Sequence, residues 1–409
     1  MICRHCQSRN LAPFLDLGTA PPSNAYLAED KLDAPELWYP LRIHVCADCL
    51  LVQTQDFASR ETLFSETYAY FSSFSTSWLT HAKTYVDEMV RRFGLGRESL
   101  VIEVAANDGY LLTHVQERGI PCLGIEPTAS TANAARQKGI EIVQDFFGEA
   151  LGRDIAEKTG GADLMVANNV LAHVPDINDF VRGFTALLKP SGVVTFEFPH
   201  LQNMIAEAQF DTAYHEHYSY LSLTAVHRIL KHHGLTVFDV ETTPWHGGSL
   251  RVFACRTDAG SHAVLPSVSR ILAQEKAAGL LDLATYAAFQ TRAITARNAF
   301  LSFLLDCQAR DEKVAAYGAA AKGNTLLNYA GIKPDLIAFV IDKNPAKQGM
   351  YMPGSRIPIV PEDRLRSEKP ERIILLPWNL QTEITQQLSY IRDWGGTFVT
   401  AIPRLTILP

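Results

Sequence analysis

The class of fold follows from the stretch Val101-Ile-Glu-Val-Ala-Ala-Asn-Asp-Gly-Tyr110. Residues 100–104 form a short apolar run of strand length, and residues 109–117 have the periodicity of a helix. A turn between a strand and a helix brings backbone N–H groups and a helix N-terminus against a bound ligand, and Gly109 permits close approach. The pattern G-x-G-x-x-G is absent, which disfavours a nicotinamide cofactor.

Strands and helices alternate on both sides of this stretch. Further strands are expected at 122–125, 141–143, 163–167 and 193–198, and helices at 76–93, 131–138 and 177–188. Such alternation predicts a doubly wound parallel α/β sheet. It restarts near residue 313, with strands expected at 314–317, 336–341, 372–376 and 398–401 and a helix ending at 329. The second set predicts a smaller α/β domain.

The 409 residues are too many for one ordinary domain. We expect a metal-binding module at 1–75, poor in regular periodicity, and the first α/β domain at 76–261. Residues 262–310 contain many Ala, Leu, Arg and Gln, and we expect them to form long helices that bridge to the second α/β domain at 311–409.

The overall charge and hydropathy restrict partners and location. A net charge of −7 without a basic stripe argues against a nucleic-acid partner. No apolar run approaches the roughly 20 residues that span a membrane, and the first residues do not resemble a signal peptide. We therefore expect a cytoplasmic protein that is not a membrane protein, and a monomer.

Four of the seven cysteines form two pairs, Cys3-x-x-Cys6 and Cys46-x-x-Cys49. Four thiolates are the ligand set of a closed, tetrahedral structural zinc site, which leaves no open position for a catalytic water. Two redox pairs or a disulfide are the alternatives. The remaining three cysteines, Cys122, Cys255 and Cys307, are expected to be packed as small apolar residues.

An acidic residue follows the second strand of the first α/β domain. Glu126, in Gly124-Ile-Glu-Pro127, is placed to accept hydrogen bonds from a ribose diol, although a helix N-terminal role is the alternative. Asp145 is a candidate for contact with an adenine amino group. The predicted cofactor contacts are Glu103, Ala105, Asn107, Gly109, Tyr110, Glu126, Pro127, Asp145, Asn168 and Asn169.

Polar segments recur where the carboxyl ends of the strands should lie. They are Thr67–Tyr70, Asn168–His173, Tyr214-His-Glu-His-Tyr218 and His246-Gly-Gly-Ser249. The chain resembles a known family along nearly its whole length. The stretches that match are the cysteine pairs, Pro21-Pro-Ser-Asn24, Glu103–Gly109, Asn168–His173, Tyr214–His217, His246–Ser249 and Gly318-Ala-Ala-Ala-Lys-Gly-Asn324. The family is the zinc-containing, S-adenosylmethionine (SAM)-dependent C-methyltransferases that act on nucleotide-linked 4-keto-deoxysugars. The chain departs from many methyltransferases at 105 and 106, where it has alanine and they have glycine.

The resemblance implies a zinc module, a class I methyltransferase core and a C-terminal Rossmann-like domain that helps hold the nucleotide sugar. It also implies methylation at C3, with Tyr68, His173, Tyr214, Glu216 and His217 in the active site. The chemistry fits these residue types, because a 4-keto group acidifies the C3–H and histidine is a base near neutral pH. We expect His217, oriented or tuned by Glu216, to remove that proton, and the C3 carbanion to attack the sulfonium methyl group.

The other members of this cluster are expected to bind or polarise the substrate. Tyr214 and His173 would donate to the 4-oxygen, where preorganised donors contribute most, and Tyr68 would act as a lid-like contact. Tyr214 could be the base instead of His217. Purely structural roles are the alternatives: His173 as a histidine at a helix end, Tyr214 as a half-buried aromatic residue, and residues 246–249 as an ordinary turn.

The expected substrate contacts are Tyr70, His215, His246, Gly247, Ser249, Lys322, Asn324, Asp342 and Lys343. Lys322 lies where a diphosphate would approach a helix N-terminus, while a Rossmann-like domain without a ligand is the alternative. Two functional alternatives also stay open. One is an O- or N-methyltransferase on a nucleotide sugar, and the other is a non-catalytic zinc-ribbon interaction protein with a degenerate methyltransferase fold.

Overall fold

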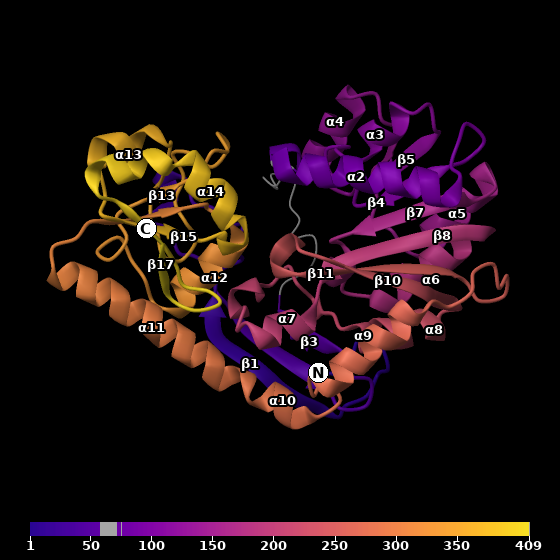
Figure 1. Ribbon diagram of the computed structural model, residues 1–409, viewed down its shortest axis with the longest axis horizontal. Helices are drawn as coiled ribbons and strands as arrows, with labels where there is room; N and C mark the ends of the chain where they lie inside the picture. The colour runs from indigo at the N-terminus through magenta and orange to yellow at the C-terminus, as the bar shows by residue number, and fades with distance from the viewer. Residues whose placement is uncertain (58–71, 75, 409) are drawn as a thin grey trace.

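Three β-sheets form the framework of the computed structural model, which describes residues 1–57, 72–74 and 76–408. Figure 1 shows the C-terminal sheet on the left and the central sheet on the right, with β1 of the N-terminal sheet below and between them. Each sheet is built around a different part of the chain, yet their contacts are extensive enough to enclose one functional site.

The N-terminal sheet is antiparallel and has the strand order β1-β2-β3-β9. Its strands are β1 (Leu11–Ala20), β2 (Tyr39–Cys46), β3 (Val52–Thr54) and β9 (Ser219–Tyr220). This region thus forms a regular sheet although its sequence is poor in regular periodicity. Register shifts after Pro13 and Asp16 break the alternation of buried and exposed residues along β1, so the strand has no clean period of two.

The central sheet has seven strands in the order β10-β11-β8-β7-β4-β5-β6. All pairs are parallel except those that β11 makes with β10 and β8. The strands are β4 (Val101–Val104), β5 (Cys122–Ile125), β6 (Ile142–Val143), β7 (Ala162–Asn168), β8 (Leu188–Pro199), β10 (Leu235–Thr243) and β11 (Ser249–Arg256). This doubly wound sheet confirms the predicted class I methyltransferase core. The strand order reverses between β4 and β7, where such sheets bind ligands.

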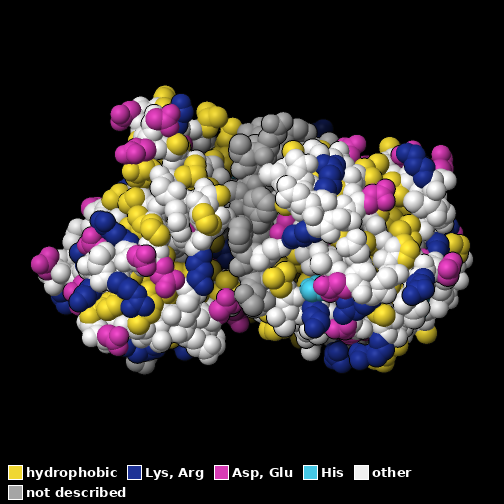
Figure 2. Space-filling model, turned by 90° about the horizontal axis from the view of Figure 1, so that it is seen from above, with side chains coloured by type: hydrophobic (Ala, Val, Ile, Leu, Met, Phe, Trp, Pro, Cys, Tyr) yellow, Lys and Arg dark blue, Asp and Glu magenta, His cyan; other side chains and the backbone are white. Residues whose placement is uncertain are grey.

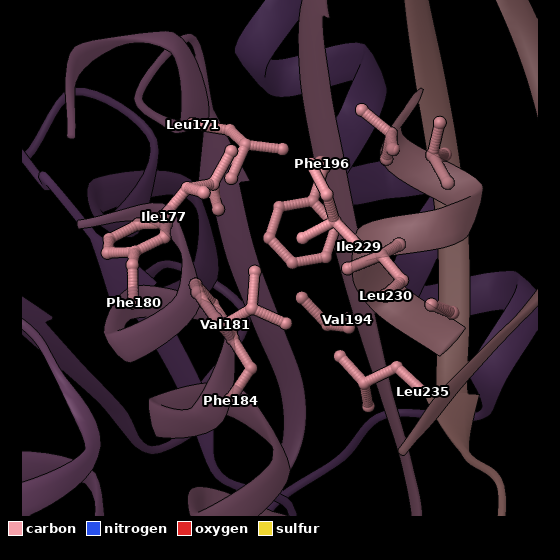
Figure 3. Packing of buried hydrophobic residues seen from close by; sticks show 14 of the residues in the cluster. Leu171, Ile177, Phe180, Val181, Phe184, Val194, Phe196, Ile229, Leu230 and Leu235 are labelled. Atoms are coloured by element: carbon pink, nitrogen blue, oxygen red, sulfur yellow. The ribbon is translucent and has the colours of Figure 1, made fainter. Parts of the chain in front are cut away.

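Helices cover both faces of the central sheet. They are α2 (Thr76–Phe93), α3 (Leu112–Gln116), α4 (Ala129–Gln137), α5 (Glu149–Thr159), α6 (Ile177–Leu187) and α8 (Leu223–His232), with short helices η3 (Leu171–His173) and η5 (Trp245–Gly247). Helices α7 (Leu201–Ala206) and η4 (Phe210–Thr212) pack instead into the cluster that the N-terminal sheet shares with α11. In Figure 3 the side chains of α6 meet Phe196 of β8 and Leu230 of α8. Phe184 and Phe196 make an edge-to-face contact at 4.9 Å.

The chain then runs through α9 (Pro266–Ala277), α10 (Leu283–Ala287) and the long α11 (Phe289–Ala309) into the C-terminal sheet. That sheet has the order β14-β13-β12-β15-β16-β17 and is parallel except for β17. Its strands are β12 (Val314–Tyr317), β13 (Val340–Ile341), β14 (Ile359–Val360), β15 (Arg372–Leu375), β16 (Thr397–Thr400) and β17 (Thr406–Leu408). The expected strand at 336–341 is only two residues long.

The remaining elements of the C-terminal domain are α12 (Ala321–Tyr329), α13 (Asp363–Glu368), α14 (Gln381–Gln387), η6 (Trp378–Leu380) and η7 (Ser389–Trp394). One buried cluster joins this domain to the N-terminal sheet through α11. Within it, Phe14 of β1 stacks on Phe289 at 4.7 Å. No helix in the described part of the chain has the length and apolar character needed to cross a bilayer.

Candidate functional site

A cavity of about 420 Å³ lies at the carboxyl ends of strands from both parallel sheets. From the central sheet, residues after β4, β5 and β7 line it, at the point where the strand order reverses. From the C-terminal sheet, residues after β12 and β15 line it, again where the strand order reverses. Acidic and basic side chains are interspersed over both lobes on the face shown in Figure 2. Two ligand-binding edges therefore share one cavity.

The loop after β4 has an unusual backbone. Ala105 and Asn107 adopt positive φ angles of 59° and 50°, a region that L-residues other than glycine seldom occupy. Asn169 and His246 do the same at 54° and 56°, and all four residues line the cavity. Strained backbone that gathers around a cavity points to function rather than to chance. Ala105 thus adopts a conformation that glycine would adopt freely.

Glu126 holds this loop in place. Its carboxylate accepts hydrogen bonds from the backbone N–H groups of Asn107 and Thr128, both at 2.9 Å. Burial raises the pKa of the Glu126 carboxyl, while these donors lower it. The carboxylate lines the cavity, so it can also accept hydrogen bonds from a ligand.

Eight of the ten predicted cofactor residues line the cavity: Ala105, Asn107, Tyr110, Glu126, Pro127, Asp145, Asn168 and Asn169. Asn168 Oδ1 and Asn169 Nδ2 are buried and have no partner among the described residues, so a polar ligand fits here. Glu103 and Gly109 do not line it. Glu103 lies buried on β4, and Gly109, at φ 74°, makes the turn that packs against Ala135.

A histidine–tyrosine pair, His217 and Tyr214, also lines the cavity. His217 Nδ1 lies 2.8 Å from the carbonyl oxygen of Thr212, which can only accept, so Nδ1 carries the proton. His217 Nε2 is then the acceptor for the hydroxyl of Tyr214 at 2.7 Å. Burial, followed by the nearby His173, lowers the pKa of His217 well below its usual value. The imidazole is therefore neutral, with its basic nitrogen on the Tyr214 hydroxyl.

His173 and Glu216 meet in a way that the sequence did not indicate. His173 Nδ1 donates to the backbone carbonyl of Glu216 at 2.9 Å, and burial lowers the pKa of His173 to about 4. The Glu216 carboxylate accepts from Asn24 Nδ2 at 3.1 Å. The expectation that Glu216 orients His217 is thus corrected: Thr212 and Tyr214 hold that ring, whereas Glu216 orients His173 through its main chain.

Lys322 enters the cavity from the first turn of α12. Its ammonium group lies 3.3 Å from the His246 carbonyl oxygen and 4.8 Å from the centre of the Trp378 ring. Burial lowers the pKa of Lys322, and Asp211 opposes that shift. Lys347 also lines the cavity, donating to the Ala319 carbonyl at 2.8 Å. Two ammonium groups beside a helix N-terminus can hold an anionic group.

Six predicted substrate contacts lie away from the cavity lining: His215, Gly247, Ser249, Asn324, Asp342 and Lys343. A Cβ at Gly247 would lie 2.5 Å from Trp378, so this glycine admits the Trp378 ring rather than a phosphate. The Ser249 hydroxyl donates to the Trp245 carbonyl at 3.0 Å and closes the turn. For Gly247 and Ser249 the ordinary-turn interpretation is the better one, whereas His246 lines the cavity.

The other four have separate structural reasons. His215 is buried against Tyr39, with ring centres 5.9 Å apart, and Asn324 is buried within α12, where it accepts from Asn328. Asp342 accepts from the N–H of Asn344 in its own loop and from the N–H of Ala319 in the loop after β12, and Lys343 is exposed. Tyr68 and Tyr70 lie outside the described residues.

The four paired cysteines meet at one point. Their sulfur atoms all lie within 4.8 Å of one another, with Cys3 to Cys49 at 3.4 Å and Cys6 to Cys46 at 3.5 Å. Zinc–sulfur bonds of about 2.3 Å in a tetrahedron place sulfurs at about 3.8 Å, so the donor set fits zinc. Gln7 and Leu50, each directly after a knuckle, both adopt positive φ angles, so the two knuckles have the same local backbone form.

Several cavity residues were not among the predicted site residues. They are Asn24, Trp78, Phe146, Phe147, Thr212, Lys347 and Asn379. Asn24 carried a signal, because its Pro-Pro-Ser-Asn motif belongs to the family resemblance. For Trp78 the sequence was misleading, because its place on the apolar face of α2 predicts a core residue rather than one that lines a cavity.

Three known sequence families match the chain. They are described as "Putative zinc binding domain" over residues 3–64, "Methyltransferase domain" over residues 78–240 and "C-methyltransferase C-terminal domain" over residues 244–403. The C-methyltransferase NovU of Streptomyces niveus is 33% identical over 406 residues, which are 99% of this chain and 96% of that protein. A ubiquinone biosynthesis O-methyltransferase of Bordetella avium is 30% identical over 98 residues, 24% of this chain and 41% of its own.

Solved methyltransferase structures match part of the chain. Magnesium protoporphyrin IX methyltransferase from Synechocystis, with bound S-adenosylhomocysteine (SAH), covers 44% of this chain and 83% of its own. The TM-score of that match is 0.35 and the identity is 15%.

Proposed function

The chain belongs to the C-methyltransferase family, and we propose that its acceptor is C3 of a nucleotide-linked 4-keto-deoxysugar. SAM-dependent methyl transfer and a four-cysteine zinc site come with the family, so the non-catalytic alternative loses its support. SAM, when bound, supplies an electrophilic methyl group. Asn107, Glu126, Asn168 and Asn169 are the residues that would hold it.

The observation that carries the proposal is the neutral imidazole of His217. A carbon becomes nucleophilic only after it loses a proton, and a keto group next to it makes that loss feasible. His217 lines the cavity, its Nε2 carries no proton and can accept one, and its Nδ1 donates to the Thr212 carbonyl. In the proposed reaction the C3–H bond breaks, its electron pair forms the enolate, and the proton passes to His217 Nε2, directly or through Tyr214.

The remaining residues support the acceptor in separate ways. The ring of His173 lies 4.6 Å from the ring of His217 and is neutral, with its proton on the Nδ1 that donates to Glu216, so its Nε2 is an acceptor for a hydroxyl group of the sugar and adds no positive charge beside the base. Lys322 and Lys347 supply positive charge to the part of the cavity wall that the C-terminal domain forms, and we place the diphosphate of the substrate there. Contacts of these residues with the sugar and with the diphosphate would position C3 for the reaction, and orientation of this kind contributes a large part of catalysis.

Deuterium exchange tests the proposal before methyl transfer takes place. Candidate acceptors carrying deuterium at C3, linked to dTDP, GDP or CDP, are incubated with the enzyme and SAH, and label loss is followed by mass spectrometry. We expect loss from one member of the panel, and the same member should be methylated at C3 when SAM is added. Label retention together with methylation of an oxygen or nitrogen would establish the competing O- or N-methyltransferase interpretation.

Two variants identify the base. His217→Ala is expected to slow C3 exchange by about 10²–10⁴-fold, because it removes the base. Tyr214→Phe should slow exchange much less, because His217 keeps its basic nitrogen and its bond to Thr212. SAH affinity, measured by calorimetry, should stay within about twofold in both. Equal and complete loss in Tyr214→Phe would make Tyr214 the base.

A further inference from the structure

The first zinc knuckle contacts the wall of the cofactor cavity through Arg4. This residue lies between Cys3 and Cys6, and its side chain is only 8% exposed. One guanidinium nitrogen donates to the Pro175 carbonyl at 2.7 Å, and another donates to the Thr54 carbonyl at 2.8 Å and contacts Asp56 at 2.7 Å. The planar fork of arginine holds two carbonyls from distant parts of the chain at once.

A second contact joins the same knuckle to the start of α6. Asn178 Nδ2 donates to the His5 carbonyl at 2.9 Å, and Asn178 Oδ1 accepts from His5 Nδ1 at 2.8 Å. Asn178 follows Pro175 by three residues, so the knuckle fixes both ends of one short segment. That segment, residues 174–178, leads from His173 into α6.

The segment forms part of the cavity wall. Val174, Pro175 and Asp176 line the cavity, as does Phe180 in the first turns of α6. Phe180 packs edge-to-face on Phe147 at 5.7 Å, and Phe147 lies two residues after Asp145 in the same wall. The position of the segment therefore sets the position of the predicted adenine side of the cavity.

We propose that Arg4 is a positioning residue for cofactor binding, acting through the Pro175 carbonyl on the cavity wall. The zinc knuckle then does more than stabilise its own module, because it presents Arg4 in an orientation that reaches Pro175 and Thr54 together. The ion pair with Asp56 contributes little, since that carboxylate is half exposed. The two carbonyl contacts carry the link: Thr54 is buried and Pro175 is half-buried, and a carbonyl that loses its donor where water has little access is costly.

Calorimetric titration with SAH tests this role without an acceptor substrate. Arg4→Ala is expected to weaken SAH binding about tenfold while the chain retains one zinc per molecule. Arg4→Lys should bind SAH within about threefold of the wild type, because an ammonium group can still reach one of the carbonyls. Arg9→Ala, an exposed arginine of the same module, is the matched control and should leave SAH affinity unchanged.

Hydrogen exchange gives a local readout that general destabilisation would not reproduce. Peptides covering residues 170–180 should exchange faster in Arg4→Ala, whereas peptides of β11 and of the C-terminal sheet should not. If Arg4→Ala loses zinc, Asn178→Ala tests the same wall from the α6 side and should weaken SAH binding about threefold. Unchanged SAH affinity in a zinc-loaded Arg4→Ala, or in Asn178→Ala where that variant replaces it, overturns the proposal.

Discussion

The two parallel sheets carry the same local device and use it differently. In the central sheet Glu126, after β5, accepts the backbone N–H of Asn107 from the loop after β4. In the C-terminal sheet Asp342, after β13, accepts the backbone N–H of Ala319 from the loop after β12 at 2.8 Å. In both, an acidic side chain after one strand fixes the loop that follows the neighbouring strand.

The two carboxylates differ in what surrounds them besides the backbone N–H that each one accepts. Glu126 lines the cavity, as do Asn168 and Asn169, whose buried Oδ1 and Nδ2 atoms have no hydrogen-bond partner in the described part of the chain. Asp342 does not line it, and its second oxygen accepts from the N–H of Asn344. A shared strand–loop–helix form therefore predicts the architecture of a loop but not whether that loop still faces a ligand.

The C-terminal loop contributes through its helix instead. Ala320, Ala321 and Lys322 at the start of α12 line the cavity, as do Pro377 and Asn379 after β15. The C-terminal domain thus completes the cavity of its neighbour. Three experiments measure how far the two loops differ, two of them in ligand binding and the third in stability.

The largest difference is expected between Glu126→Ala and Asp342→Ala. Glu126→Ala should weaken SAH binding about 100-fold, because charged hydrogen bonds to the ligand are lost and the Asn107 loop loses its acceptor. Asp342→Ala should leave SAH affinity within about twofold. Calorimetry on both variants decides, and comparable losses in the two would mean that the C-terminal loop also binds the cofactor.

A smaller effect is expected for Lys322→Met, which keeps the length of the side chain but removes its charge. The KM for the acceptor identified in the exchange panel should rise about tenfold, because the half-buried cation that we propose to hold the diphosphate is lost. SAH affinity should not change. Lys343→Ala, in the exposed part of the next loop, is the control. A fall in SAH affinity in place of a rise in KM would move Lys322 to the cofactor side.

The smallest effect concerns stability alone. Asp342→Ala removes acceptors for two backbone N–H groups and should lower the free energy of unfolding by about 1 kcal/mol. Asp342→Asn keeps one oxygen acceptor and should lose less. Chemical denaturation of the two variants measures both values. Greater loss in Asp342→Asn than in Asp342→Ala would contradict a role based on acceptors.

Local patterns predicted the central sheet and the four-cysteine cluster, and eight of the ten residues expected to bind the cofactor line the cavity. These features depend on short windows: an apolar run, a turn and a helix, or two cysteines three residues apart. What could not be predicted depends on distant pairing. The pairing of β3 with β9 joins Val52 to Tyr220, and no property of either two- or three-residue strand indicates the other.

The substrate side was predicted less well for a related reason. Gly247 and Ser249 stand in a polar, glycine-rich segment, which indicates backbone approach but not what approaches. Trp378 occupies that space in the folded chain, and it arrives from a domain more than 100 residues away. Glu216 presents the same problem, because its neighbour in sequence, His217, is not the histidine that it orients.

The strand β9 has a consequence for synthesis on the ribosome. The N-terminal sheet lacks its fourth strand until residue 220 has emerged, although its first three strands are complete by residue 54. Until then the edge of β3 is an open template for pairing with other nascent chains. A gene fragment that ends before residue 219 would leave that edge permanently open, so the module cannot be separated from the core by a simple cut in sequence.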